Sequence, residues 1–244
     1  MANILVVPDC HVRPTVNQRR FVWLNKLVRE RKPEYIVWLG DVFDFNSLCL
    51  HDKLKVDFLK RSYNDDCNAG AWAFSKAMEG YNGKTFFIEG NHENRIERVI
   101  SEDSRFAPFL RETYERSIPK NVKKLIFPNG IEIEGVHFMH YAISGIHNRP
   151  TSGENPATAL LNKAYLSCIV GHSHLYDYSE RSRVDGKKIQ ALVAGCFLDE
   201  AQKEEYAGNA QKLWRNCITY LHNVKNGNFD FELISYERLK KEYA

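Results

Sequence analysis

The sequence predicts an α/β fold in which two mixed β-sheets pack face to face with helices outside. The first half of the 244-residue chain alternates apolar, β-branched runs with helical patterns. Most of the second half reads as strands and hairpins. Four of the apolar runs stop at residue types that bind metals, and such residues converge where strand ends meet at one edge of a sheet.

The first half contains three predicted strands, each followed by a helical pattern. The strands cover 4–7, 35–39 and 85–88, and the helices about 16–31, 69–79 and 94–116. Phe21, Leu24 and Val28 lie on one face of the first helix, and Gly80 can end the second helix in a left-handed conformation. The polar stretch 46–66 has a weak pattern and is expected to form a loop or short helix beside the site.

The second half begins with strands at 123–127 and 131–133, which are expected to flank a turn at 128–130. Next come a strand at 135–139, a loop at 144–156, a helix at 157–164 and a strand at 166–170. The remainder looks all β, with one hairpin turning at Asp185-Gly186 and another at Asn226-Gly227.

Bulk composition narrows the class of protein. The length suits one large domain covering 1–244, and 43% hydrophobic with 27% charged residues is typical of soluble globular proteins. A net charge of +3 neither indicates nor excludes a nucleic-acid surface. Six cysteines without a CxxC pair favour a reduced, cytoplasmic location. The first apolar run is too short for a signal-peptide core, and no stretch approaches membrane-spanning length.

Potential metal ligands follow four of the predicted strands. They lie in Asp9-Cys10-His11, Gly40-Asp41, Gly90-Asn91-His92-Glu93 and Gly171-His172-Ser173-His174. Alone, each would read as a turn residue, a helix N-cap or a satisfied core histidine. His172 and His174 alternate on a segment expected to be extended, so both cannot point into an apolar core. Four such segments after strands favour a pair of divalent cations bound by mixed nitrogen and oxygen ligands.

The ordered pattern D-x-H, GD, GNH followed by an acidic residue, a lone His and GHxH resembles the calcineurin-like metallophosphoesterases. The resemblance runs across most of the chain and implies a four-layer α/β-β/α sandwich. Gly195-Cys196-Phe197-Leu198-Asp199 adds a softer resemblance to compact phosphoesterases of phage and bacterial genomes.

The resemblance implies two divalent cations that share one bridging carboxylate. The first would be bound by Asp9, His11, Asp41 and His174, and the second by Asp41, Asn91, His140 and His172. Manganese is favoured, while iron, zinc, nickel, cobalt and magnesium stay open. His137 also lies on the strand before His140 and faces the opposite way. In the family, the lone histidine ligand lies at the C-terminal end of its strand, which favours His140. Tyr141 follows His140 here, where the family often has glycine.

The resemblance also implies a proton donor, His92, which does not bind metal. Glu93 is expected to orient His92 and to raise its pKa. Asp44 is expected to lie behind the metal ligands.

The substrate is less well determined. The protein serine/threonine phosphatases of this superfamily carry GDxVDRG, whereas Phe45 follows Asp44 here, so their phosphate-binding arginine is absent. Arg95 and Arg149 are the best alternative phosphate contacts, although solvated surface arginines are an equally good interpretation. Trp214 reads as a packing residue, and His51, His147 and His222 read as surface or loop residues.

We therefore expect a hydrolase of phosphodiester bonds, with nucleic acid or a nucleotide as substrate and a metal-activated hydroxide as nucleophile. The alternatives are a phosphomonoesterase acting on protein or small molecules and, less favoured, a non-catalytic scaffold with the same fold. The sequence leaves the oligomeric state open.

Overall fold

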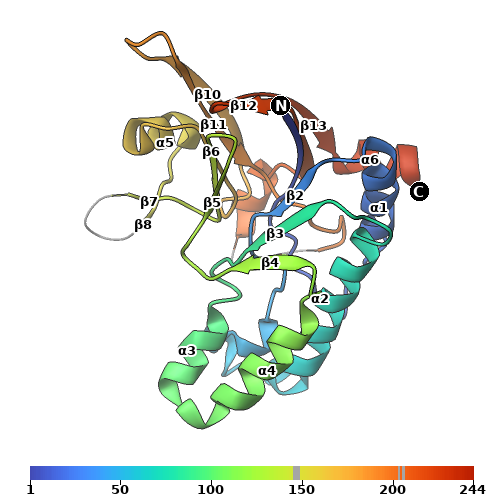
Figure 1. Ribbon diagram of the computed structural model, residues 1–244. Helices are drawn as coiled ribbons and strands as arrows, with labels where there is room; N and C mark the ends of the chain where they lie inside the picture. The colour runs from blue at the N-terminus through green and yellow to red at the C-terminus, as the bar shows by residue number, and fades with distance from the viewer. Residues whose placement is uncertain (145–148, 203, 205–206) are drawn as a thin grey trace.

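Two mixed β-sheets pack face to face in the computed structural model of the chain, with helices on both outer faces (Figure 1). The structure describes residues 1–144, 149–202, 204 and 207–244. Part of the predicted loop at 144–156, including His147, lies outside the described residues.

The larger sheet has six strands in the order β13-β12-β1-β2-β3-β4. Its strands are β1 (Ala2–Val7), β2 (Tyr35–Trp38), β3 (Lys84–Ile88), β4 (Val122–Leu125), β12 (Cys217–Lys225) and β13 (Asn228–Ser235). The strands β1 to β4 are parallel, and β12 runs antiparallel to both β1 and β13. The carboxyl ends of β1, β2 and β3 therefore share one edge.

The smaller sheet has five strands in the order β10-β11-β9-β6-β5. Its strands are β5 (Ile131–Ile133), β6 (Val136–Met139), β9 (Cys168–Val170), β10 (Tyr176–Ser182) and β11 (Lys188–Ala194). Within it, β6, β9 and β11 are parallel. A separate ribbon pairs β7 (Ile143–Ser144) with β8 (Arg149–Pro150).

The described helices are α1 (Arg20–Arg31), α2 (Tyr63–Ala77), α3 (Arg95–Glu102), α4 (Ala107–Ser117), α5 (Pro156–Ala164) and α6 (Tyr236–Tyr243). Short 3-10 helices are η1 (Asn46–Leu48), η2 (Leu50–Asp52), η3 (Val56–Lys60), η4 (Ser104–Phe106) and η5 (Gly208–Leu213). Over the described part of the chain, no helix has the length and apolar character needed to span a membrane.

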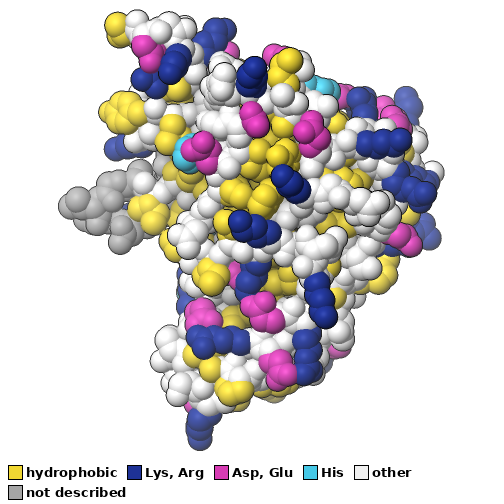
Figure 2. Space-filling view, viewed as in Figure 1, with side chains coloured by type: hydrophobic (Ala, Val, Ile, Leu, Met, Phe, Trp, Pro, Cys, Tyr) yellow, Lys and Arg dark blue, Asp and Glu magenta, His cyan; other side chains and the backbone are white. Residues whose placement is uncertain are grey.

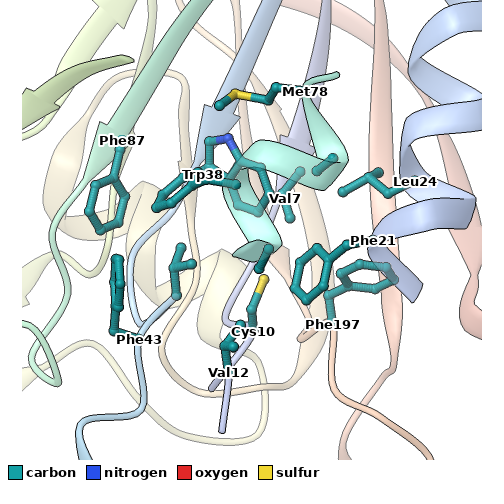
Figure 3. Packing of buried hydrophobic residues seen from close by; sticks show 14 of the residues in the cluster. Val7, Cys10, Val12, Phe21, Leu24, Trp38, Phe43, Met78, Phe87 and Phe197 are labelled. Carbon is teal, nitrogen blue, oxygen red and sulfur yellow. The ribbon is translucent and has the colours of Figure 1, made fainter. Parts of the chain in front are cut away.

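Three apolar clusters separate four layers. Along β1, Leu5 and Val7 belong to the cluster under α1, α2, α4 and α6, while Ile4 and Val6 belong to the cluster between the sheets. Figure 3 shows Trp38 at the centre of the first cluster. A third cluster joins the smaller sheet to α5. The predicted sandwich of two mixed sheets flanked by helices is confirmed.

Several local predictions need correction. The turn at 128–130 does not join two paired strands, because β4 pairs with β3 in the larger sheet and β5 with β6 in the smaller one. The helical stretch at 94–116 is interrupted at Asp103, whose side chain accepts a hydrogen bond from the backbone of Arg105 (3.0 Å). The helix α1 begins at Arg20, four residues later than expected.

Two helix boundaries depend on serine caps that the sequence analysis overlooked. The helix α2 begins at Tyr63, earlier than predicted, and the Ser62 side chain accepts from the Asp65 backbone N–H. The last part of the chain is not all β, because Ser235 caps α6 in the same way and Leu239 is fully buried against the larger sheet's outer cluster. The helix α6 has only eight residues, too few for its apolar pattern to be recognised after the preceding strands.

Candidate metal centre

The segments that follow β1, β2, β3, β6 and β9 meet at one end of the sandwich. They carry the seven ligands predicted from the sequence: Asp9, His11, Asp41, Asn91, His140, His172 and His174. Three of the strands belong to the larger sheet and two to the smaller one, so the cluster lies where the carboxyl ends of both sheets converge.

The first group surrounds Asp9. The Nε2 atom of His174 lies 3.2 Å from Asp9 Oδ2 and 3.2 Å from His11 Nε2. His11 Nε2 is also 3.7 Å from Asp41 Oδ2. These four side chains are all buried and could hold one cation.

The second group shares Asp41 with the first. His140 Nε2 lies 3.5 Å from Asp41 Oδ2 and 2.9 Å from Asn91 Oδ1. Ligand atoms of Asp41, His140 and His172 lie within 4.8 Å of one another. Asp41 Oδ2 therefore faces both groups, a position from which a carboxylate can bridge two cations.

Protonation states match a cation-binding role. Burial, together with the charge of His92, lowers the pKa of His11, and burial with the charge of His140 lowers the pKa of His172 to about 4. Burial alone would raise the pKa of Asp41, but neighbouring imidazoles outweigh it and lower that pKa. Neutral imidazole and ionised carboxylate are the forms that bind metals, so the donor set fits divalent cations.

The ring of His140 is oriented by the backbone. Its Nδ1 donates to the carbonyl oxygen of Leu39 (2.8 Å), so Nε2 faces Asp41 and Asn91. His137 lies outside the cluster, is about one-third exposed and forms an ion pair with Glu132 (2.9 Å). The structure thus brings His140, not His137, to the site.

Four candidate ligands have a left-handed backbone. The φ angles are +42° at His11, +48° at Asp41, +70° at His172 and +60° at His174. This region is uncommon for residues other than glycine and is concentrated at functional sites. The prediction that His172 and His174 alternate on an extended segment is therefore wrong, because two left-handed residues turn both side chains toward the cluster.

Two glycines allow carboxylates to approach the backbone closely. A Cβ atom at Gly90 would lie 2.2 Å from Asp41 Oδ1, and one at Gly171 would lie 2.3 Å from Asp9 Oδ1. The His172 backbone N–H donates to Asp9 (2.9 Å), and that of His92 donates to Asp41 (2.8 Å). Both glycines are thus required by the positions of the two aspartates.

Asp44 contacts three side chains beside the cluster. Its Oδ1 lies 3.1 Å from His11 Nδ1 and 3.0 Å from His92 Nδ1, and its Oδ2 accepts from Arg13 Nε (2.5 Å). Burial would raise the pKa of Asp44, but the hydrogen bonds with His11 and His92 hold it well below its usual range. Asp44 lies behind His11, where the sequence analysis expected it.

The expected pairing of Glu93 with His92 needs correction. The Glu93 carboxylate accepts hydrogen bonds from the backbone N–H groups of Asp41 (2.9 Å), Phe43 (2.9 Å) and Gly90 (2.7 Å). It therefore ties the segment after β2 to the segment after β3. Asp44 instead contacts His92, whose pKa burial would lower but Asp41 and Asp44 raise.

The cluster forms part of a cleft of about 790 Å³. Arg95 lines it, donates to the Asp44 carbonyl (2.8 Å) and places Nη2 at 3.1 Å from His92 Nε2. Arg149 lies exposed on β8 and is not among the lining residues, so the structure does not bring it to the site.

Other residues that line the cleft were not predicted to lie there. His51, predicted to be a surface or loop residue, lines the cleft. Trp214 also lines it and packs its ring edge-to-face with His174, at 4.1 Å between centroids, in keeping with a packing residue. Arg13 and Glu204 were missed. Arg13 stands two residues after His11, which was the available signal, but nothing in the sequence pointed to Glu204.

Comparisons with known proteins give matches among solved structures and one match to a family model. Among solved structures, YfcE, a phosphoesterase from E. coli, matches with 13% identity and a TM-score of 0.44, covering 96% of this chain and 100% of that one. The Pseudomonas putida nuclease MPE matches with 12% identity and a TM-score of 0.35, covering 94% and 87%. A search of curated proteins gives no match. The family model for calcineurin-like phosphoesterases matches residues 2–200, which is most of the sequence, and the chain therefore belongs to the calcineurin-like phosphoesterase family.

Proposed function

We propose that the chain is a dinuclear metal-dependent phosphodiesterase that acts on nucleic acid or nucleotides. The observation that carries the proposal is the position of Asp41, whose Oδ2 lies 3.7 Å from His11 Nε2 and 3.5 Å from His140 Nε2. A carboxylate between two ligand groups suits cations ~3.5–4 Å apart, the usual spacing of two-metal hydrolases.

Each cation would have its own ligand group. Asp9, His11, Asp41 and His174 would hold the first, and Asp41, Asn91, His140 and His172 the second. When bound, the two cations would lower the pKa of a water molecule and neutralise charge on the phosphate. The mixed nitrogen and oxygen ligands suit manganese, iron, zinc, cobalt or nickel, and we favour manganese.

His92 is the proposed proton donor to the leaving group. Its Nδ1 is held 3.0 Å from Asp44 Oδ1, and the raised pKa keeps a proton available on the ring. In this structure Arg95 Nη2 donates to His92 Nε2 (3.1 Å), so Arg95 would turn from the ring to the phosphate when substrate binds and Nε2 would then carry the proton. Arg95 would bind a phosphate oxygen there.

Cleft size and surface charge support a diester. At about 790 Å³ the cleft has room for a second ester group beyond the scissile phosphate. Figure 2 shows basic and acidic side chains interspersed on the face that it draws, and the net charge is +3. Any polynucleotide should therefore be held by few phosphates, giving a log–log salt dependence no steeper than about −2.

The test is a comparison of catalytic efficiencies on bis(p-nitrophenyl) phosphate and p-nitrophenyl phosphate under the same metal. Cyclic nucleotides, single-stranded DNA and RNA are assayed in parallel. We expect the diester to be preferred and at least one nucleotide substrate to be cleaved. A clear monoester preference without nucleotide cleavage would favour the phosphomonoesterase, and metal binding without any hydrolysis would identify a scaffold.

A further inference from the structure

An ion pair lies in the wall of the cleft, beside the candidate metal centre. Arg13 Nη2 donates to Glu204 Oε1 (2.7 Å) and Oε2 (2.5 Å), and Arg13 Nε donates to Asp44 Oδ2 (2.5 Å). Both partners line the cleft, and their side chains are only 18% and 4% exposed. They are 191 residues apart in the sequence.

Arg13 is placed to bind the substrate phosphate. Asp44, which orients the guanidinium of Arg13, also contacts His11 and His92. Arg13 is therefore linked through Asp44 to a candidate metal ligand and to the proposed proton donor. Its Nη1 forms no hydrogen bond with any described residue, which leaves N–H donors for an anion. Two carboxylates fix the orientation of the group before substrate binds.

Glu204 limits the charge that this arginine can offer. Its carboxylate is held by Arg13 and by Gln202 Nε2 (3.0 Å), and its backbone N–H donates to Gln211 Oε1 (3.1 Å), so it cannot easily turn away. A fixed negative charge beside Arg13 repels a dianionic monoester more than a monoanionic diester. At ~8 Å and an effective dielectric constant of ~20, one extra unit of charge changes affinity about thirtyfold.

We propose that Arg13 binds the substrate phosphate and that Glu204 makes this contact selective for monoanionic diesters over dianionic monoesters. The inference rests on the proposed phosphodiesterase function and supplies its basis for substrate choice. In this proposal Arg13, from the segment that follows β1, takes the phosphate-binding role of the arginine that follows the position of Asp44 in the protein phosphatases.

The first test changes the charge of Glu204 with little change of shape. In Glu204→Gln, the ratio of kcat/KM for bis(p-nitrophenyl) phosphate to that for p-nitrophenyl phosphate, measured at pH 8, should fall about thirtyfold. Glu204→Asp keeps the charge and should keep the ratio. The control is Glu200→Gln, which breaks an exposed ion pair with Lys240 (2.8 Å) outside the cleft. A purely structural role would lower both efficiencies equally in Glu204→Gln, and that unchanged ratio would overturn the proposal.

The second test needs no turnover. Calorimetry of the metal-loaded protein with inorganic phosphate should show about tenfold weaker binding in Arg13→Met and tighter binding in Glu204→Gln. Arg149→Met is the control, because Arg149 is exposed and does not line the cleft. Unchanged phosphate affinity in a folded Arg13→Met protein would overturn the role of Arg13, whether or not Glu204→Gln folds.

Failure of this inference can be told apart from failure of the proposed function. The wild-type preference between the two nitrophenyl substrates tests the function. The inference is tested separately, by the change in kcat/KM that Glu204→Gln causes for each substrate relative to the wild-type protein. A wild-type enzyme that prefers the monoester would refute the function, whereas the sign of the Glu204→Gln effect would still decide the inference.

Discussion

The floor and the rim of the cleft are built differently. On the floor, His11, Asp41 and His174 are at most 2% exposed and are held by contacts with Asp44, the His92 backbone and Asp9. On the rim, the stretch from η1 to η3 consists of short 3-10 turns, and Leu54 and Leu59 are 92% and 87% exposed. We infer that the floor determines the reaction and tolerates little change, whereas the rim determines the substrate and can vary.

The largest effect should follow a change at the centre of the floor. Asp41→Asn should weaken both metal sites and reduce turnover about 10³-fold or more, because several kcal/mol of charge stabilisation depend on the cations. His140→Ala should mainly weaken the second site. Elemental analysis and turnover of both variants test this, and full two-metal occupancy with normal activity in Asp41→Asn would remove Asp41 from the ligand set.

A smaller loss is expected where the floor contacts the leaving group. His92→Ala should keep its metals and lose ~10²–10⁴-fold in turnover, the range for one general acid–base group. The loss should shrink for substrates with good leaving groups, because these need no protonation. Elemental analysis separates the roles, since metal loss in this variant would make His92 a ligand.

Acid should weaken the floor of the metal-free protein. The pKa of His172 is about 4 when folded against an ordinary value of 6.5, so between these values the unfolded chain binds more protons. Stability should therefore fall as the pH drops from 6.5 to 4, by on the order of 3 kcal/mol from this residue. Urea unfolding of chelator-treated wild type and His172→Gln at pH 7 and pH 4.5 measures the difference. If the free energy of unfolding depended on pH equally in both proteins, the lowered pKa of His172 would be contradicted.

Outside the floor the effects should be smallest, and there Arg95 and Arg149 should differ. Arg95→Met should raise KM about 10–100-fold, the loss expected for a hydrogen bond with a charged group. Arg149→Met should stay within about twofold of wild type, because the exposed residue does not line the cleft. Steady-state kinetics on the nitrophenyl diester measure both effects. Equal changes in KM for the two variants would contradict the prediction that only Arg95 contacts the substrate.

The same contrast explains what the sequence could predict. A strand and the residue that ends it are specified locally, so the runs before Asp9, Asp41 and His172 predicted both sheets and the positions where polar groups leave them. The layer arrangement was predicted from the alternating first half, the β-rich second half and the family resemblance, and the apolar residues on both faces of β1 are consistent with it.

Long-range partnerships could not be predicted in this way. The choice of Asp44 over Glu93 as the partner of His92 depends on how the segments after β2 and β3 pack together. The contact between Arg13 and Glu204 joins opposite ends of the chain, and Glu204 follows no strand. Rim positions therefore depend on tertiary packing more than on any local signal.

The candidate ligands come from both sheets, and this has a consequence for the lifetime of the protein. Asp9, Asp41 and Asn91 follow strands of the larger sheet, while His140 and His172 follow strands of the smaller one. A bound cation would act as a non-covalent cross-link between the two halves of the sandwich, because they could not separate without releasing it. Resistance to proteases and slow amide exchange would then be greater in the metal-bound protein than in the metal-free protein.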